Sequence, residues 1–146
     1  MTCEKSPLPT PVLVVVVERH GAVVGWPLVL PGEPPIVGLP FHKSRKTLEL
    51  IRHSRFFSIN LIRDVERAYE IFGRPGENKL ERWGSFEKCK LLECYRLGDA
   101  ERVVECIYDG EISIGEHSVV LCKVAISYGC GDFGVWDPCV HQRRGG

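Results

Sequence analysis

The segment of this chain that is richest in reactive side chains runs from Phe41 to Thr47 and reads Phe-His-Lys-Ser-Arg-Lys-Thr. It places three full positive charges, a histidine and two hydroxyl groups where a predicted strand gives way to a predicted helix. Free backbone N–H groups at a helix start, together with Arg and Lys, make an anion-binding site. The same pattern also suits a solvated helix start with its charges facing water, so both interpretations stay open here.

A second candidate is His117, which follows Gly115 and Glu116 in a predicted turn between two long strands. At the rim of a barrel, this histidine could donate a proton or contact a substrate. The other interpretation is a simple hairpin turn in which His117 only begins the next strand. The five histidines are scattered, and none shows the i, i+4 spacing of helical metal ligands, so we expect no metal site.

Other motifs that could carry function are absent or lack their context. Residues 129–134 read Gly-x-Gly-x-x-Gly, but only twelve residues follow, and Pro138 stands where the helix of a dinucleotide site would run. We therefore expect a glycine-rich turn there. The sequence contains neither a Walker A motif nor a Gly-x-Ser-x-Gly elbow. Lys plus Arg and Asp plus Glu both number 19, and this zero net charge argues against a nucleic-acid-binding protein.

Composition suggests where the protein works. The apolar run from Val12 to Val17 is far too short to span a bilayer and is followed by two charged residues. We therefore expect neither a signal peptide nor a membrane span, and a cytoplasmic protein. Few Asn, Gln and Met residues beside many charged ones suggest a thermophile. None of the seven cysteines forms a Cys-x-x-Cys pair, so most are expected in the core, although thermophile disulfides leave a bridge open.

The length of 146 residues predicts one domain over residues 1–146. Alternating apolar runs and turns predict strands at 11–19, 22–30 (interrupted by Pro27), 36–41, 56–62, 89–95, 102–114 and 118–128. Helices are expected from Ser44 as N-cap to Ser54, after Asp64 as N-cap to Phe72, and at 79–83. We also expect a turn at His20-Gly21, a bulge at 108–110, and arms at 1–10 and 129–146 that are flexible or wrap a dimer partner.

The order of several short motifs resembles that of a known family. Gly32-Glu33-Pro34-Pro35 precedes a strand, Thr47 opens a helix, and Phe57-Ser58-Ile59-Asn60-Leu61 follows. Farther on come Val104-Glu105-Cys106 and Gly115-Glu116-His117. The series is similar to the flavin reductase-like FMN-binding split-barrel family from about residue 11 to residue 124. The resemblance implies a mainly β, six-stranded Greek-key split barrel with short peripheral helices, which forms a homodimer and binds FMN near the subunit interface.

The resemblance also assigns roles to residues. In the family, residues around the Thr-initiated helix contact the flavin phosphate, which carries over to Ser44, Arg45 and Thr47, and to His42 and Lys43 beside them. The segment after the second strand lies against the isoalloxazine ring, and its counterparts here are Gly25, Trp26, Pro27 and Leu28. The histidine of the Gly-Asp-His motif, here His117, lies near the docking place of the nicotinamide.

The function that the resemblance implies is transfer of a hydride from NAD(P)H to FMN and of electrons to a small acceptor, such as free flavin or a ferric chelate. Two other interpretations stay open: storage of FMN or another anionic cofactor without turnover, and a structural dimer in which Trp26 fills the lost flavin site. The sequence departs from the family in having Glu116 in place of Asp and no Ser, Thr or Asn at 24–31. We expect Val14, Val16 and the Trp residues to need cover from a partner subunit.

Overall fold

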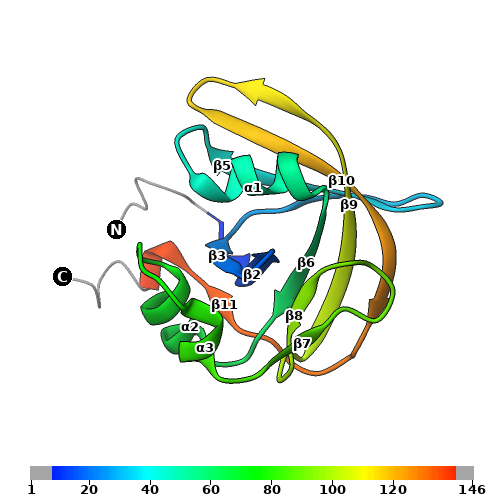
Figure 1. Cartoon of the computed structure of the whole chain (residues 1–146). Helices are drawn as coiled ribbons and strands as arrows, with labels where there is room; N and C mark the ends of the chain where they lie inside the picture. Colours follow the sequence, from blue (N-terminus) through cyan, green and yellow to red (C-terminus); the bar gives the residue numbers. More distant parts are fainter. Residues whose placement is uncertain (1–7, 141–146) are drawn as a thin grey trace.

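The computed structural model describes residues 8–140, and its centre is an antiparallel sheet curled into a split barrel (Figure 1). Seven strands follow one another in the order β3-β2-β6-β9-β10-β5-β4. Their bounds are β2 Leu13–Val17, β3 His20–Val24, β4 Leu28–Leu30, β5 Ile36–His42, β6 Phe56–Leu61, β9 Arg102–Ile114 and β10 His117–Tyr128. The predicted mainly β split barrel is thus confirmed, with one strand more than the expected six, because the short edge strand β4 pairs with β5.

Three helices, two small ribbons and a short helical segment at 138–140 complete the described part of the chain. The helices are α1 Lys46–Ser54, α2 Val65–Phe72 and α3 Lys79–Trp83. One ribbon pairs β1 Thr10–Pro11 with β11 Val135–Trp136, and the other pairs β7 Phe86–Lys88 with β8 Tyr95–Leu97. No helix within residues 8–140 is long and apolar enough to cross a bilayer.

Strand β2 is buried on both of its faces, which explains its unbroken run of apolar residues. Leu13, Val15 and Val17 face the barrel core, where α1 adds Leu48 and Ile51. The alternate residues Val12, Val14 and Val16 belong to a second core under α2 and α3. Our expectation that Val14 and Val16 need a partner subunit is therefore wrong, because both are fully buried within the chain and Trp83 packs in the same second core.

Two local predictions at element ends are wrong. The turn before β3 lies at Glu18 and Arg19, with Glu18 at a positive φ of 53°, so His20 opens the strand opposite Val17. The N-cap of α1 is Arg45 and not the predicted Ser44, and no side chain caps the helix. The Ser44 hydroxyl pairs with the His42 ring instead. The predicted cap of α2 is confirmed: the Asp64 carboxylate accepts the Arg67 N–H at 3.1 Å.

The predicted strand at 89–95 is also wrong. Residues 89–94 form the loop of the β7–β8 ribbon, and Tyr95 begins β8; Cys89 and Cys94 are joined by a disulfide. The ribbon lies on the outer face of the sheet and is held there by buried side chains. Asn60 accepts the Leu97 N–H at 2.9 Å, the Ser58 hydroxyl donates to the Tyr95 carbonyl at 2.6 Å, and the Glu105 carboxylate accepts three amides of the loop.

The glycine-rich segment after β10 folds back over the domain. Gly134 N–H donates to the Ile62 carbonyl at 2.7 Å, and a Cβ at Gly134 would collide with Val65. Gly129, at a φ of 91°, passes directly over the backbone at Glu101 and Arg102. The glycines thus allow residues 129–134 to pack closely on their own domain, where the sequence predicts a free or partner-wrapping arm, and the helical residues 138–140 come only after them. Residues 141–146 lie outside the described part.

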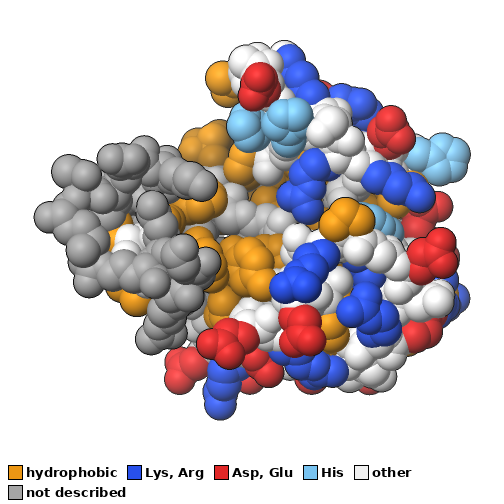
Figure 2. Space-filling model, turned by 90° about the vertical axis from the view of Figure 1, so that its left-hand side faces the viewer, with side chains coloured by type: hydrophobic (Ala, Val, Ile, Leu, Met, Phe, Trp, Pro, Cys, Tyr) orange, Lys and Arg blue, Asp and Glu red, His pale blue; other side chains and the backbone are white. Residues whose placement is uncertain are grey.

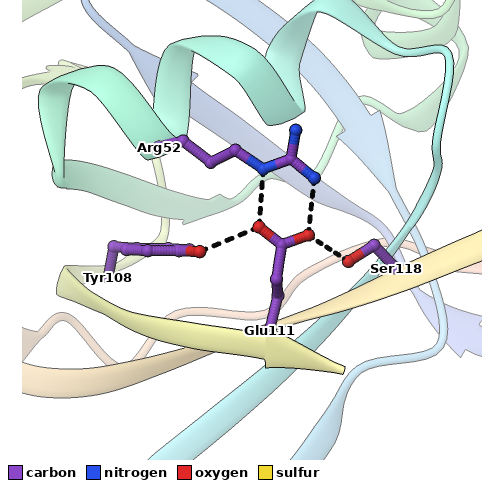
Figure 3. A network of polar contacts seen from close by, with 4 residues as sticks. All are labelled: Arg52, Tyr108, Glu111 and Ser118. Carbon is purple, nitrogen blue, oxygen red and sulfur yellow. Dashed lines mark hydrogen bonds and ion pairs between the residues drawn. The ribbon is translucent and has the colours of Figure 1, made fainter. Parts of the chain in front are cut away.

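A polar network fastens α1 to the β9–β10 hairpin (Figure 3). Arg52 of α1 binds both oxygens of Glu111 on β9, at 2.6 and 2.7 Å. Tyr108 and Ser118 donate their hydroxyls to the same carboxylate. The hydrogen bond from Arg52, together with those from Ser118 and Tyr108, lowers the pKa of Glu111 to about 2 despite its partial burial. The predicted bulge lies in the same hairpin, where the β9–β10 register shifts at Gly110.

Candidate functional site

A cavity of about 510 Å³ lies where the start of α1, the edge strand β3 and the α2–α3 connection meet. Positively charged side chains line it, and no Asp or Glu is among its lining residues. The four cations are Arg45, Lys46, Arg74 and Lys79, and they are joined by the polar side chains of His20 and Thr47. Figure 2 shows one face of the molecule, on which Lys and Arg side chains lie among acidic side chains and apolar surface. Such a lining favours an anionic ligand.

The fold places two of these cations by using them to cover the open edge of β3. This strand has a sheet neighbour only on its β2 side. On the other side, the Lys79 ammonium donates to the Gly21 carbonyl at 3.3 Å, and the Arg45 guanidinium donates to the Val23 carbonyl at 3.2 Å. Burial lowers the pKa of both, and for Lys79 the charge of Arg45 lowers it further. Neither cation has a carboxylate partner among the ion pairs of the described residues.

His20 and Thr47 form the polar floor of the cavity. The His20 Nε2 lies 2.9 Å from the hydroxyl of Thr47, which is almost fully buried. Burial, strengthened by the positive charges of Lys79, Lys46 and Arg45, lowers the pKa of His20 to about 4. The ring is therefore neutral at pH 7, and it can fix the Thr47 hydroxyl without adding a further charge.

A second group of predicted residues gathers at the end of β5 and β10. His42 and His117 are opposite each other across these strands, with ring centroids 5.6 Å apart in an edge-to-face arrangement. The His42 Nδ1 lies 2.7 Å from the Ser44 hydroxyl, and its Nε2 lies 3.9 Å from Glu116. The Lys43 N–H donates to the Glu116 carbonyl at 3.0 Å. All these side chains are exposed, as expected for a rim.

The third predicted group, residues 25–28, forms the connection from β3 to β4. Trp26 has a positive φ of 51°, and its side chain is 43% exposed. Its backbone N–H donates to Thr10 Oγ1 at 2.5 Å, and its indole N–H donates to the Leu8 carbonyl at 2.9 Å. Gly25 and Pro27 flank it, and Leu28 is exposed at the start of β4. Trp26 therefore lies at the surface, outside the cationic cavity.

Of the nine predicted cofactor-binding residues, only Arg45 and Thr47 line the cavity. The turn that leads into α1 joins the rim group to them, since the Arg45 N–H donates to the His42 carbonyl at 3.0 Å. Sequence reasoning missed His20, Lys46, Arg74 and Lys79. Lys46 belongs to the basic segment from Phe41 to Thr47, whereas the other three come from distant segments that only the fold brings together.

The comparison with known families decides what kind of protein carries this site. A model of the flavin reductase like domain matches residues 5–143, nearly the whole chain. The chain belongs to the flavin reductase like family. The cofactor class of this family is a flavin.

Solved structures of flavin reductase like proteins share the fold. The NADH:FAD oxidoreductase SgcE6 of Streptomyces globisporus C-1027 has a TM-score of 0.80 at 19% identity, over 90% of this chain and 83% of that one. BorF, the flavin reductase component of a bacterial two-component tryptophan halogenase, has a TM-score of 0.80 at 15% identity, over 91% of this chain and 89% of that one. The FMN-binding protein from Thermus thermophilus has a TM-score of 0.73 at 19% identity, over 84% of this chain and 71% of that one. No match was found among curated protein sequences.

The state of His20 gives a direct test of the cationic cavity. Because its pKa is lowered in the folded chain, the unfolded chain binds a proton between about pH 6.5 and 4 that the folded chain does not. Folding stability should therefore fall as the pH drops through this window. In an NMR titration, we expect the His20 ring to titrate near pH 4 and at a higher pH when Lys79→Gln removes a neighbouring charge. Binding of inorganic phosphate should also raise the pKa of His20. Titration of His20 near pH 6.5 in the free protein would contradict a cavity that is buried and positively charged.

Proposed function

We propose that the protein binds FMN with the phosphate in the cationic cavity and works as an NAD(P)H-dependent flavin reductase. The observation that carries the proposal is the lining of this cavity, in which four cations and a buried hydroxyl meet and no carboxylate is present. A phosphomonoester is a dianion whose oxygens accept several charge-assisted hydrogen bonds. Arg45, Thr47 and Lys79 are the side chains that we assign to it, with Lys46 and Arg74 at the mouth.

The start of α1 adds to the fit. The N-cap residue, Arg45, has an extended backbone and no side-chain cap, so the first turn of a nine-residue helix begins at the cavity without a competing side-chain acceptor. Helix N-termini of this kind favour phosphate groups through their free N–H groups and their dipole. The neutral His20 holds the Thr47 hydroxyl in place beside them. The residues present therefore suit a phosphate in charge, in hydrogen-bonding type and in number.

In the proposed reaction, the bound flavin supplies the redox chemistry by taking a hydride and passing electrons on. The work of this chain is to bind and orient. Arg45 and Thr47 fix the phosphate end, while His42 and His117 stand at the exposed rim, where a nicotinamide and then a small electron acceptor can approach. An imidazole at this rim can contact the substrate or donate a proton.

The phosphate assignment predicts a change in ligand preference. Arg45→Ala should weaken FMN binding by roughly ten- to a hundred-fold, since a hydrogen bond to a charged group contributes roughly 1.5–3 kcal/mol. The double substitution Arg45→Ala with Thr47→Ala should erase the preference for FMN over riboflavin. Riboflavin has no phosphate and should bind almost as before, as measured by flavin fluorescence titration. Lys43→Ala is the matched control, because this neighbouring cation does not line the cavity. Equal losses for both flavins would mean that α1 had moved.

The rim assignment predicts an effect on turnover without an effect on folding. His117 is exposed, and the described ring contacts give it one neighbour, the ring of His42, in an edge-to-face arrangement. His117→Ala should lower NAD(P)H-dependent flavin reduction by about ten-fold or more, with the melting temperature little changed. His53→Ala, an exposed histidine in the last turn of α1, is the control. A variant that melts much earlier but retains normal activity when folded would contradict the assignment.

We also propose that the protein is a homodimer, for a reason different from the one that the sequence suggested. The whole of β4 is exposed although it is apolar, with Leu28, Val29 and Leu30 between 47% and 58% accessible. Ile112 and Ile114 on β9 are similarly exposed. Apolar surface of this kind favours association. Light scattering should give twice the chain mass at micromolar concentration, and a stable monomer would contradict the proposal.

A further inference from the structure

The loop of the β7–β8 ribbon contains a cysteine pair that the proposed flavin chemistry does not use. Cys89 and Cys94 are joined by a disulfide, with Cα atoms 5.2 Å apart. The pair closes a short loop of six residues, so the cross-link removes less freedom from the unfolded chain than a long-range disulfide would. A role other than stabilising the fold is therefore worth examining for this pair.

The shape of this loop is set by a buried carboxylate beneath it. Glu105 on β9 is fully buried and accepts the N–H groups of Lys90, Leu91 and Leu92 at 2.7, 2.9 and 2.9 Å. The hydroxyl of Tyr128 donates to the same carboxylate at 2.7 Å. Burial by itself would raise the pKa of Glu105, but these four hydrogen bonds outweigh it and lower the pKa below the usual value. The carboxylate stays charged and holds the loop.

These hydrogen bonds keep the two cysteines side by side independently of the covalent bond between them. The Cys89 N–H donates to the Cys94 carbonyl at 2.8 Å, which ties the two ends of the loop together through the backbone. The sulfur atoms of both cysteines and an oxygen of Glu105 lie within 4.8 Å of one another. After reduction, the two thiols would therefore remain close enough to close the disulfide again without a search by the chain.

The cysteine pair is also accessible from outside. Both cysteines line a cavity of about 360 Å³, whose far wall is formed by Glu18, Ser54 and Phe56. Cys89 is partly exposed, whereas Cys94 is 8% exposed. An attacking sulfur would thus meet Cys89 first, with Cys94 as the leaving group. The free cysteines Cys106 and Cys122 lie buried in the barrel core and offer no such access.

We propose that Cys89 and Cys94 form a reversible thiol–disulfide site that exchanges electrons with an external dithiol while the domain stays folded. The thiolate of the dithiol attacks the Cys89 sulfur, the bond to Cys94 breaks, and Cys94 takes up a proton. The second thiol of the reductant then attacks the mixed disulfide and releases Cys89, which is also protonated. Two electrons and two protons pass to the pair, and the dithiol becomes a disulfide.

The test measures thiols and folding together. The full chain is equilibrated in mixtures of reduced and oxidised dithiothreitol, trapped by alkylation, and mapped by peptide mass, while near-UV circular dichroism reports the packing. We expect residues 89 and 94 to become alkylated together while the circular dichroism stays native, and the disulfide to re-form on oxidation. Reduction only when the native signal is lost, or no reduction of the folded chain, would overturn the proposal. Stoichiometric zinc uptake by the reduced pair would overturn it in favour of a metal site.

Two carboxylates on one strand provide a matched pair of variants. Glu105→Gln removes the charge that holds the loop and should lower the equilibrium constant for closing the disulfide by roughly ten-fold. Glu111→Gln makes the same change at the other end of β9, away from the loop, and should leave this constant unchanged. If Glu105→Gln does not fold, Tyr128→Phe removes a single hydrogen bond and should lower the constant by a smaller factor. Equal effects at positions 105 and 111 would contradict the role given to Glu105.

Discussion

The arrangement around the candidate site depends on how the open edge of β3 is covered. This strand ends the sheet, and its carbonyl groups at Gly21 and Val23 would lack partners without the Lys79 and Arg45 side chains. The two hydrogen bonds tie β3 to α3 and to the start of α1. Close packing completes the arrangement, since a Cβ at Gly21 would collide with the ring of Phe72 on α2. The same cations that close the sheet therefore form the wall of the cavity.

This use of cations has an electrostatic consequence. Positive charges on Arg45, Lys46 and Lys79 lie near one another without a carboxylate in the lining, and their field helps keep His20 neutral. The repulsion among them is relieved when an anion binds, so the cavity is set for a ligand with more than one negative charge. The rim residues are exposed, and the charges of Lys43 and Glu116 there are opposite in sign. They suit a different task, namely transient contact with a substrate.

Short-range patterns in the sequence predicted most of the fold. The valine run of β2, the apolar face of α2 with its Asp64 cap, and the long hairpin of β9 and β10 all lie where the pattern places them. The apolar pattern predicts a strand at residues 89–95, but residues 89–94 form a loop whose amides are held by Glu105, a residue more than ten positions away. Apolar composition alone does not indicate such a partner.

The motifs that signalled the family have a structural explanation in this chain. Asn60 is fully buried and holds both the Val14 carbonyl and the Leu97 N–H, while Glu105 holds the loop of the same ribbon. These residues fasten the β7–β8 ribbon to the sheet and do not line the cationic cavity. The site itself was predictable only in part. The basic segment gave Arg45 and Thr47, but Lys79 reaches the cavity from α3, where its position in the sequence carries no sign of burial.

The central claim is that the cationic cavity holds the phosphate of a flavin, and a crystal structure of the protein with FMN tests it most directly. The account predicts phosphate oxygens within hydrogen-bonding distance of the Arg45 guanidinium and the Thr47 hydroxyl, with Lys79 beside them. A flavin whose phosphate lies elsewhere, for example beside Lys43 or the C-terminal Arg143 and Arg144, would contradict it.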